Sequence, residues 1–121
     1  MAALVGSEGK DEQGMHVLQI EHPISDFSTW KASFDRFSDK RRHSGVRRHQ
    51  IYQPSGDPNY VVLDLEFENE GEAEPFLGWL RREVWSTREA SPALAGGPQT
   101  RIAKVMGYQE YRSTVAKAPL G

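Results

Sequence analysis

The stretch from Met15 to Phe37 constrains the fold most, because it indicates a short β-strand that passes through a His-Pro step into an amphipathic helix. Residues 16–22 alternate between two sets of side chains, which is the two-residue period of a strand. Pro23 lacks an amide proton and disfavours helical angles in the residue before it, so we expect the strand to end near His22. Asp26 is a good N-cap for the helix that follows.

This helix carries one aromatic stripe, whose members recur at three- and four-residue steps: Phe27, Trp30, Phe34 and Phe37. Burial of each ring is worth roughly 2 kcal/mol or more, which far exceeds differences in helix propensity. We therefore interpret the stripe as core packing rather than as a cofactor site.

The composition fits one soluble globular domain. The chain has 121 residues, of which 26% are charged and 37% hydrophobic, with a net charge of -2. The absence of cysteine excludes disulfides, thiolate metal sites and cysteine catalysis. Residues 1–14 resemble neither a signal peptide nor a membrane span, so we expect a flexible arm there and take the cytoplasm as the default location.

The rest of the chain predicts three further strands and a second helix. We expect strands over 46–53, 60–67 and 99–106, and a helix from Asn69, spaced from Glu72 as in a capping box, to about Ser86. Pro75 predicts either a kink in this helix or a helix that begins at Pro75. The domain would cover residues 15–106, followed by a partly disordered C-terminal extension over 107–121.

The element order is β-α-β-β-α-β, which predicts an α+β fold of the ferredoxin-like type. Right-handed crossovers place both helices on one face of a four-stranded antiparallel sheet. The open face would carry Val46, Tyr52, Tyr60 and Val62, roughly several hundred Å² of apolar surface. We therefore predict a homodimer with its sheets packed face to face around a cavity; the alternative is a monomer with a semi-polar face.

The run H-V-L-x-I-x-H-P-I-x-D-F-x-x-W-K-x-x-F-D over residues 16–35, together with Asp57-Pro58-Asn59 before a hydrophobic strand, resembles small dimeric α+β barrel proteins such as the antibiotic biosynthesis monooxygenases. The resemblance spans roughly residues 15–106. It implies the same fold, a dimer and a cavity. Characterised relatives use such a cavity for cofactor-free oxidation of polycyclic aromatics, haem degradation or isomerisation.

The chain departs from the active members of that family at one point. Quinol oxygenases and haem-degrading relatives commonly pair an asparagine with a tryptophan in the pocket. The only asparagines here are Asn59 and Asn69, which we expect at a hairpin turn and a helix cap. No catalytic residue of the family therefore transfers to this sequence.

The candidate site residues come from the chemistry of individual side chains. His22 and Tyr60 are the proposed proton donors or acceptors, and the proposed ligand-binding residues are Gln50, Tyr52, Asp64 and Trp79. Glu21 is a poor partner for His22, because adjacent strand residues point to opposite faces. The alternative role of His22 is a hydrogen bond that fixes the strand-helix junction.

Metal, cofactor and nucleic-acid sites are not predicted. In this fold His22 and His49 would lie on strands about 10 Å apart, too far to share a metal ion. The basic cluster from Lys40 to Arg48 lacks the RNA-binding consensus and is interpreted as a solvated turn. The leading hypothesis is a homodimer whose cavity binds a small apolar or aromatic molecule, as a cofactor-independent monooxygenase or cyclase-like enzyme. The alternative is a non-catalytic dimer for ligand binding or protein interaction.

Overall fold

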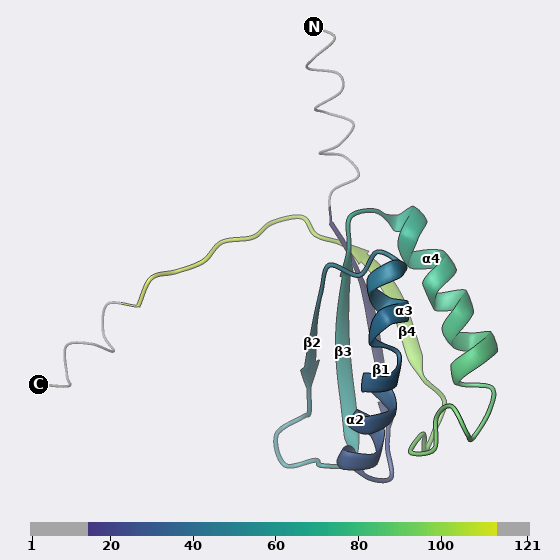
Figure 1. Cartoon of the computed structure of the whole chain (residues 1–121). Coiled ribbons are helices and arrows are strands. Elements are labelled where there is room, and N and C mark those ends of the chain that lie inside the picture. Colours follow the sequence, from purple (N-terminus) through teal and green to yellow (C-terminus); the bar gives the residue numbers. More distant parts are fainter. Residues whose placement is uncertain (1–14, 114–121) are drawn as a thin grey trace, which may run out of the picture.

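The computed structural model describes residues 15–113, which form a four-stranded antiparallel sheet covered by helices on one face (Figure 1). The elements are β1 (His16–Pro23), α2 (Phe27–Arg36), α3 (Ser38–His43), β2 (Arg48–Tyr52), β3 (Tyr60–Phe67), α4 (Glu70–Trp79), the π-helical turn η1 (Leu80–Val84) and β4 (Gln99–Lys104). The strand order is β2-β3-β1-β4. This arrangement confirms the predicted ferredoxin-like α+β fold.

The central pair of strands, β1 and β3, supplies most of the sheet's core face. Leu18 pairs with Leu65 and Ile20 pairs with Leu63, and all four side chains are buried. Every second residue along both strands is buried and the residues between are partly exposed. The alternating sequence therefore folds as it predicts, with one face against the helices and one face open.

The first helix begins where its cap predicts and carries the aromatic stripe toward the sheet. The Asp26 carboxylate accepts the amide of Thr29 at 2.8 Å, which satisfies one of the free N–H groups of the first turn. Trp30 is buried, whereas Phe27, Phe34 and Phe37 are partly buried against the core. Within the stripe, Trp30 therefore belongs to the core, and the other three rings are only partly covered.

A short helix, α3, follows and includes the first residues of the basic cluster over 40–48, which was interpreted as a solvated turn. Its backbone continues almost directly from α2, with the Phe37 carbonyl accepting the amide of Arg41 at 3.0 Å. No side chain caps its start, so the sequence carries no local start signal for it.

The second helix begins at its predicted cap, Asn69, whose side chain accepts the Glu72 amide at 3.0 Å. Pro75 lies inside α4, so the alternative that the helix begins at Pro75 is wrong. Pro75 is exposed, which keeps its ring away from the core. After α4 the backbone continues into the wider turn of η1, which places Leu80 and Val84 in the core.

Two strands are shorter than predicted, for reasons that lie in their neighbours. β2 begins at Arg48 because the Val46 amide instead donates to the Arg41 carbonyl at 3.0 Å, closing the turn after α3. Val46 therefore packs on the core. The expectation that it lies on the open face is wrong. β4 ends at Lys104 because its partner β1 begins at His16. One further backbone bond follows, in which the Val105 amide donates to the Met15 carbonyl.

Residues 105–113, which follow β4, run away from the body of the domain (Figure 1). This segment carries large apolar side chains that are almost fully exposed, including Met106, Tyr108 and Tyr111. The arm over 1–14 and residues 114–121 of the predicted extension lie outside the described residues. Within residues 15–113 no helix is long and apolar enough to cross a membrane.

Gly45 is required by its backbone angle. Its φ is +103°, a left-handed conformation that costs other residues roughly 1–2 kcal/mol, and a Cβ there would lie 2.8 Å from the Glu72 carboxyl carbon. We expect Gly45→Ala to lower the free energy of unfolding by about 1–2 kcal/mol in urea titrations. The matched change Gly97→Ala, at a position with open space and no positive φ, should stay within about 0.5 kcal/mol of the parent. Equal effects of the two changes would contradict this assignment.

Candidate ligand-binding pocket

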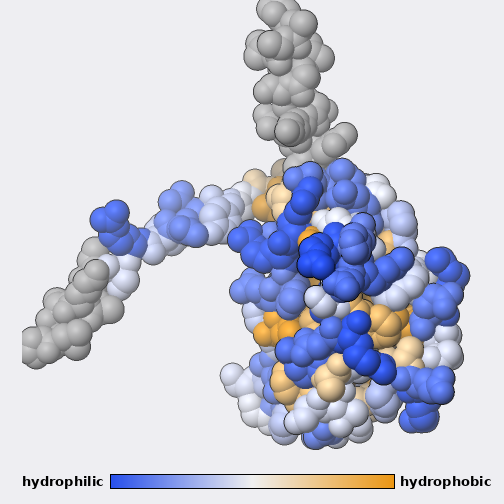
Figure 2. All heavy atoms as spheres, in the orientation of Figure 1, coloured by the Kyte–Doolittle hydropathy of each residue, from blue (hydrophilic) through white to orange (hydrophobic). Residues whose placement is uncertain are grey.

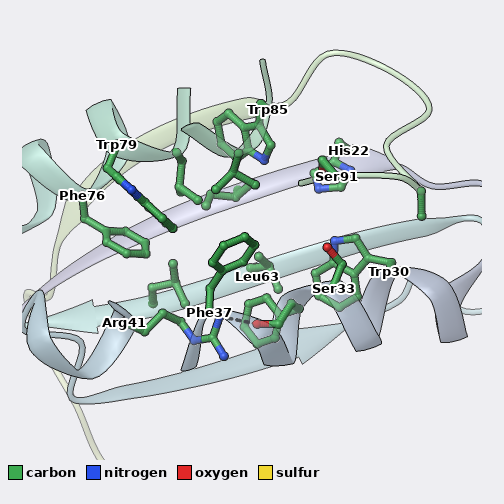
Figure 3. Close-up of a pocket in the computed structure, with 16 residues that line it drawn as sticks. His22, Trp30, Ser33, Phe37, Arg41, Leu63, Phe76, Trp79, Trp85 and Ser91 are labelled. Atoms are coloured by element: carbon green, nitrogen blue, oxygen red, sulfur yellow. Dashed lines mark hydrogen bonds between the residues drawn. The ribbon is translucent and has the colours of Figure 1, made fainter. Parts of the chain in front are cut away.

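A pocket lies between the helices and the covered face of the sheet (Figure 3). Its walls include six aromatic rings contributed by α2, the α2–α3 junction, α4 and the turn after η1: Trp30, Phe34, Phe37, Phe76, Trp79 and Trp85. The free space is about 50 Å³, which is room for a few water molecules. Pockets for organic ligands usually enclose several hundred Å³, so a ligand would enter by displacing side chains.

The aromatic rings contact one another around the pocket. Trp30 stacks on Phe34 with ring centroids 5.0 Å apart, and Trp79 packs against both Phe37 and Phe76 at 5.4 Å. On the molecular surface, apolar side chains gather between the helices and are surrounded by hydrophilic ones (Figure 2). The rings therefore favour the binding of flat apolar molecules, and the opening of the pocket has a polar rim.

His22 is the titratable residue that lies deepest among these rings. It is only 2% exposed and meets both Trp30 and Trp85 edge-on, with ring centroids 6.5 Å apart in each case. Its Nδ1 lies 3.0 Å from the Pro23 carbonyl oxygen. Because a carbonyl only accepts, Nδ1 carries the proton and Nε2 of the neutral ring is an acceptor. Burial lowers the pKa of His22, and the bond to Pro23 only partly opposes this effect.

Tyr60, the other predicted catalytic residue, lies on the opposite face of the sheet. The register pairs His22 with Val61 and Tyr60 with Pro23, so His22 points toward the helices and Tyr60 toward the open face. The Tyr60 hydroxyl donates to Glu21 at 2.8 Å, and this bond raises the pKa of Tyr60. His22 and Tyr60 therefore do not face one cavity within the chain, and their catalytic roles stay predictions, whereas the separation of Glu21 from His22 is confirmed.

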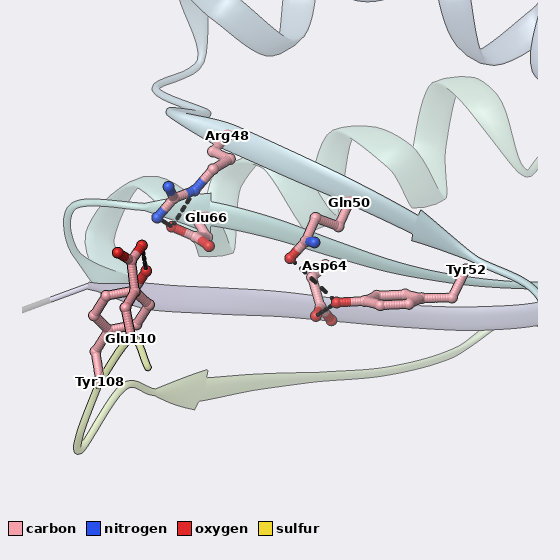
Figure 4. Close-up of polar contacts among 7 residues, drawn as sticks. All are labelled: Arg48, Gln50, Tyr52, Asp64, Glu66, Tyr108 and Glu110. Carbon is pink, nitrogen blue, oxygen red and sulfur yellow. Dashed lines mark hydrogen bonds and ion pairs between the residues drawn. The ribbon is translucent and has the colours of Figure 1, made fainter. Parts of the chain in front are cut away.

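The predicted ligand-binding residues also divide between the two faces. Trp79 lines the pocket with His22, while Gln50, Tyr52 and Asp64 lie together on the open face (Figure 4). There the Tyr52 hydroxyl lies 3.0 Å from Asp64 Oδ2 and 3.2 Å from Gln50 Oε1. Its bond to Asp64 raises the pKa of Tyr52.

Hydrogen bonds across the strands make the open face more polar than predicted. The Arg101 guanidinium on β4 donates to Gln19 on β1 at 2.7 Å, and Arg48 on β2 pairs with Glu66 on β3 at 2.9 Å (Figure 4). Val62, on the same face of β3, is partly exposed. A partner sheet on this face would have to match a polar pattern.

The basic cluster over 40–48 is not one charged surface. Arg42 pairs with Asp39 at 2.6 Å, Arg47 with Glu68 at 3.1 Å and Arg48 with Glu66. Lys40 lies over the Trp79 ring at 5.1 Å. Arg41, interpreted from sequence as part of a solvated turn, is instead buried and lines the pocket.

Sequence reasoning missed several residues that line the pocket, most notably Arg41 and Ser33. The signal for Arg41 was the helical spacing, because it follows Phe34 and Phe37 by seven and four residues and so continues the aromatic stripe. Ser33 carried no comparable signal; its hydroxyl donates to the Ala90 carbonyl at 2.8 Å, a contact with a distant loop.

The described part of the chain contains no group of three or more histidine and acidic side chains that could hold a metal ion. His22 and His49 are separated by β3, as the predicted strand order requires.

The buried His22 predicts a pH dependence of stability. The unfolded chain binds a proton on His22 near pH 6.5, whereas the folded chain binds it only at lower pH, because its pKa is lowered. The free energy of unfolding should therefore keep this contribution above pH 6.5 and lose it as pH falls from 6.5 toward the lowered pKa. Urea titrations between pH 7.5 and 5 should show a smaller decline for His22→Gln than for the parent. His49, whose pKa is also lowered, remains in both proteins, so equal declines would contradict the assignment to His22.

Comparison with solved structures finds the same architecture at low sequence identity. A monooxygenase of Streptomyces coelicolor in complex with nanaomycin D is 20% identical, with a TM-score of 0.58 over 87% of this chain and 99% of that chain. A proposed antibiotic biosynthesis monooxygenase of Nitrosomonas europaea is 16% identical, with a TM-score of 0.57 over 78% and 92%. A dimeric ferredoxin-like protein from an uncultured marine organism is 9% identical, with a TM-score of 0.56 over 78% and 98%.

No protein-family model and no curated protein matches the sequence. The resemblance noted from the strand-helix motif is confirmed at the level of the fold by the structural matches. The chain has the architecture of the antibiotic biosynthesis monooxygenase-like and dimeric ferredoxin-like proteins.

Proposed function

We propose that the pocket between the helices and the sheet binds a small apolar or aromatic molecule. The observation that carries this proposal is the buried imidazole of His22, held among the rings of Trp30 and Trp85 in a pocket with six aromatic side chains in its wall. The Streptomyces coelicolor monooxygenase with a similar fold is in complex with nanaomycin D, which supports a small organic ligand. Trp79, at the α4 side of the pocket, would contact this ligand.

The chemistry that we propose is oxygenation without a cofactor. Nε2 of His22 would remove a proton from an acidic C–H or O–H group of an electron-rich aromatic substrate. The resulting anion would reduce O₂ directly, with one oxygen atom entering the substrate as a carbonyl and the other leaving as water. A methylene that becomes a carbonyl in this way consumes one O₂ and releases one water, so the reaction needs no other reductant.

We also propose a homodimer that forms through the open face of the sheet. A similarly folded protein is described as a dimeric ferredoxin-like protein, which supports this assembly. Exposed Tyr52 on β2 and the exposed apolar side chains of the C-terminal segment, such as Met106 and Tyr108, also favour a partner surface. In such a dimer Gln50, Asp64 and Tyr60 would face the partner.

Two alternatives follow from the division of the candidate residues. The first places the reaction between subunits, with Tyr60 as the proton donor or acceptor and Gln50, Tyr52 and Asp64 as ligand contacts. The second is a dimer that binds a ligand or a protein without turnover. The cytoplasmic location expected from the sequence stays a prediction.

Oxygen uptake tests the proposed reaction. With anthrone under air, the full chain should consume one O₂ per anthraquinone formed. Because general-base catalysis is worth at least about a hundredfold, His22→Gln should reduce the rate by that factor or more. The same substitution at His43, an exposed residue of α3 that does not line the pocket, is the matched control and should leave the rate unchanged.

Tyr60→Phe distinguishes the two locations of the site. A loss of uptake in Tyr60→Phe with normal rates in His22→Gln would move the site to the open face. Absence of uptake above the protein-free rate, with anthrone still binding, would favour the non-catalytic alternative.

Analytical ultracentrifugation tests the dimer. The molar mass measured for the parent at micromolar concentration should be twice that of one chain, which is 13.7 kDa. Val62→Arg, which adds a charge at a partly exposed position on the open face, should shift the protein to monomer. Ala32→Arg adds the same charge on the exposed surface of α2 and should leave the dimer intact. A monomeric parent, or equal masses for both variants, would rule out this interface.

A further inference from the structure

Arg41 is the charged side chain of the pocket. It comes from α3, is only 7% exposed, and lines the same pocket as His22 and Trp79 (Figure 3). Its Nη1 donates to the Phe34 carbonyl at 2.7 Å, and its Cζ lies 3.6 Å from the centroid of the Phe34 ring. This stacking holds the plane of the guanidinium against the aromatic wall.

The guanidinium has no carboxylate partner among residues 15–113. The four ion pairs in this part of the chain join Lys31 to Asp35, Arg42 to Asp39, Arg47 to Glu68 and Arg48 to Glu66. Asp35 is the acidic group whose charge reaches Arg41, yet its carboxylate is held by Lys31 at 3.0 Å. A buried positive charge without a counterion is costly, and chains rarely keep one without a use for it.

Arg41 also keeps hydrogen-bonding capacity free. A guanidinium carries five N–H donors in a planar fork, and one of them is engaged here by a described residue. The fork matches the two oxygens of a carboxylate, and it also binds a single anionic oxygen. The other titratable residue of the pocket, His22, is neutral near pH 7 because burial lowers its pKa, so it adds no competing charge.

We infer that Arg41 selects the ligand, and that the pocket takes an aromatic molecule bearing an anionic oxygen, a carboxylate or a phenolate. The unpaired buried guanidinium would bind the oxygen while the surrounding rings bind the aromatic body. This inference rests on the proposed ligand-binding function and adds the charge of the ligand to it. In the proposed reaction the same contact would stabilise the anion that forms when His22 removes the proton.

Calorimetric titration of the full chain with 2-naphthoate and with 2-naphthamide, at pH 7.5, tests the inference. The two probes share size and ring and differ in charge. The parent should bind 2-naphthoate at least tenfold more tightly, because a buried charge-assisted contact is stronger than a neutral one. Equal affinities would overturn the inference and leave the ligand-binding pocket standing. Binding of neither probe would overturn both.

Variants assign the preference to Arg41. Arg41→Gln should remove the preference for 2-naphthoate while the affinity for 2-naphthamide changes less than threefold. Arg41→Lys, which keeps the charge without the fork, should retain part of it. Arg42→Gln, a neighbour on the same helix whose partner is Asp39, should keep the full preference.

Circular dichroism and thermal melting of each variant establish that it folds. If Arg41→Gln does not fold, Arg41→Met, which keeps an apolar side chain of similar reach without the charge, takes its place, and an undiminished preference in that variant would overturn the inference. An undiminished preference in folded Arg41→Gln would overturn the inference outright.

Discussion

The pairing of β1 with β3 is the constraint on which the rest of the structure depends. Leu18 against Leu65 and Ile20 against Leu63 bury one face of the central strands, and the helices can only pack there. A shift of one residue in this register would exchange the two faces completely. The same register decides the functional question, because it sends His22 into the pocket and Tyr60 to the open face.

The fold was predictable because strong local patterns agreed with the global topology. β3 lies where its alternation predicts, and both helices begin at their predicted caps, Asp26 and Asn69. Helix α3 was not predictable in this way, since six residues without a side-chain cap carry little signal. Only part of the candidate site was predictable. His22 and Trp79 do line one pocket. Whether Tyr60 shares a face with His22 depends on the strand register, which sequence alone does not supply.

The polar residues of the pocket show how a small domain combines stability with a site. Ser33 donates to the Ala90 carbonyl and His22 Nδ1 to the Pro23 carbonyl, so these two polar groups of the pocket are anchored to backbone. The Ser33 contact ties α2 to the loop that carries Ala90, which stabilises the fold, whereas the His22 bond lies within β1. The His22 bond uses Nδ1 and leaves Nε2 able to accept from another partner.

The three tryptophans of the chain, Trp30, Trp79 and Trp85, all line the pocket. Indole emission depends on the polarity and the quenchers around each ring. The ultraviolet emission of the whole protein is therefore a built-in optical signal from one cavity, with no background from indoles elsewhere. Entry of any molecule between the helices and the sheet should change the wavelength or the intensity of this emission, without a label or an engineered probe.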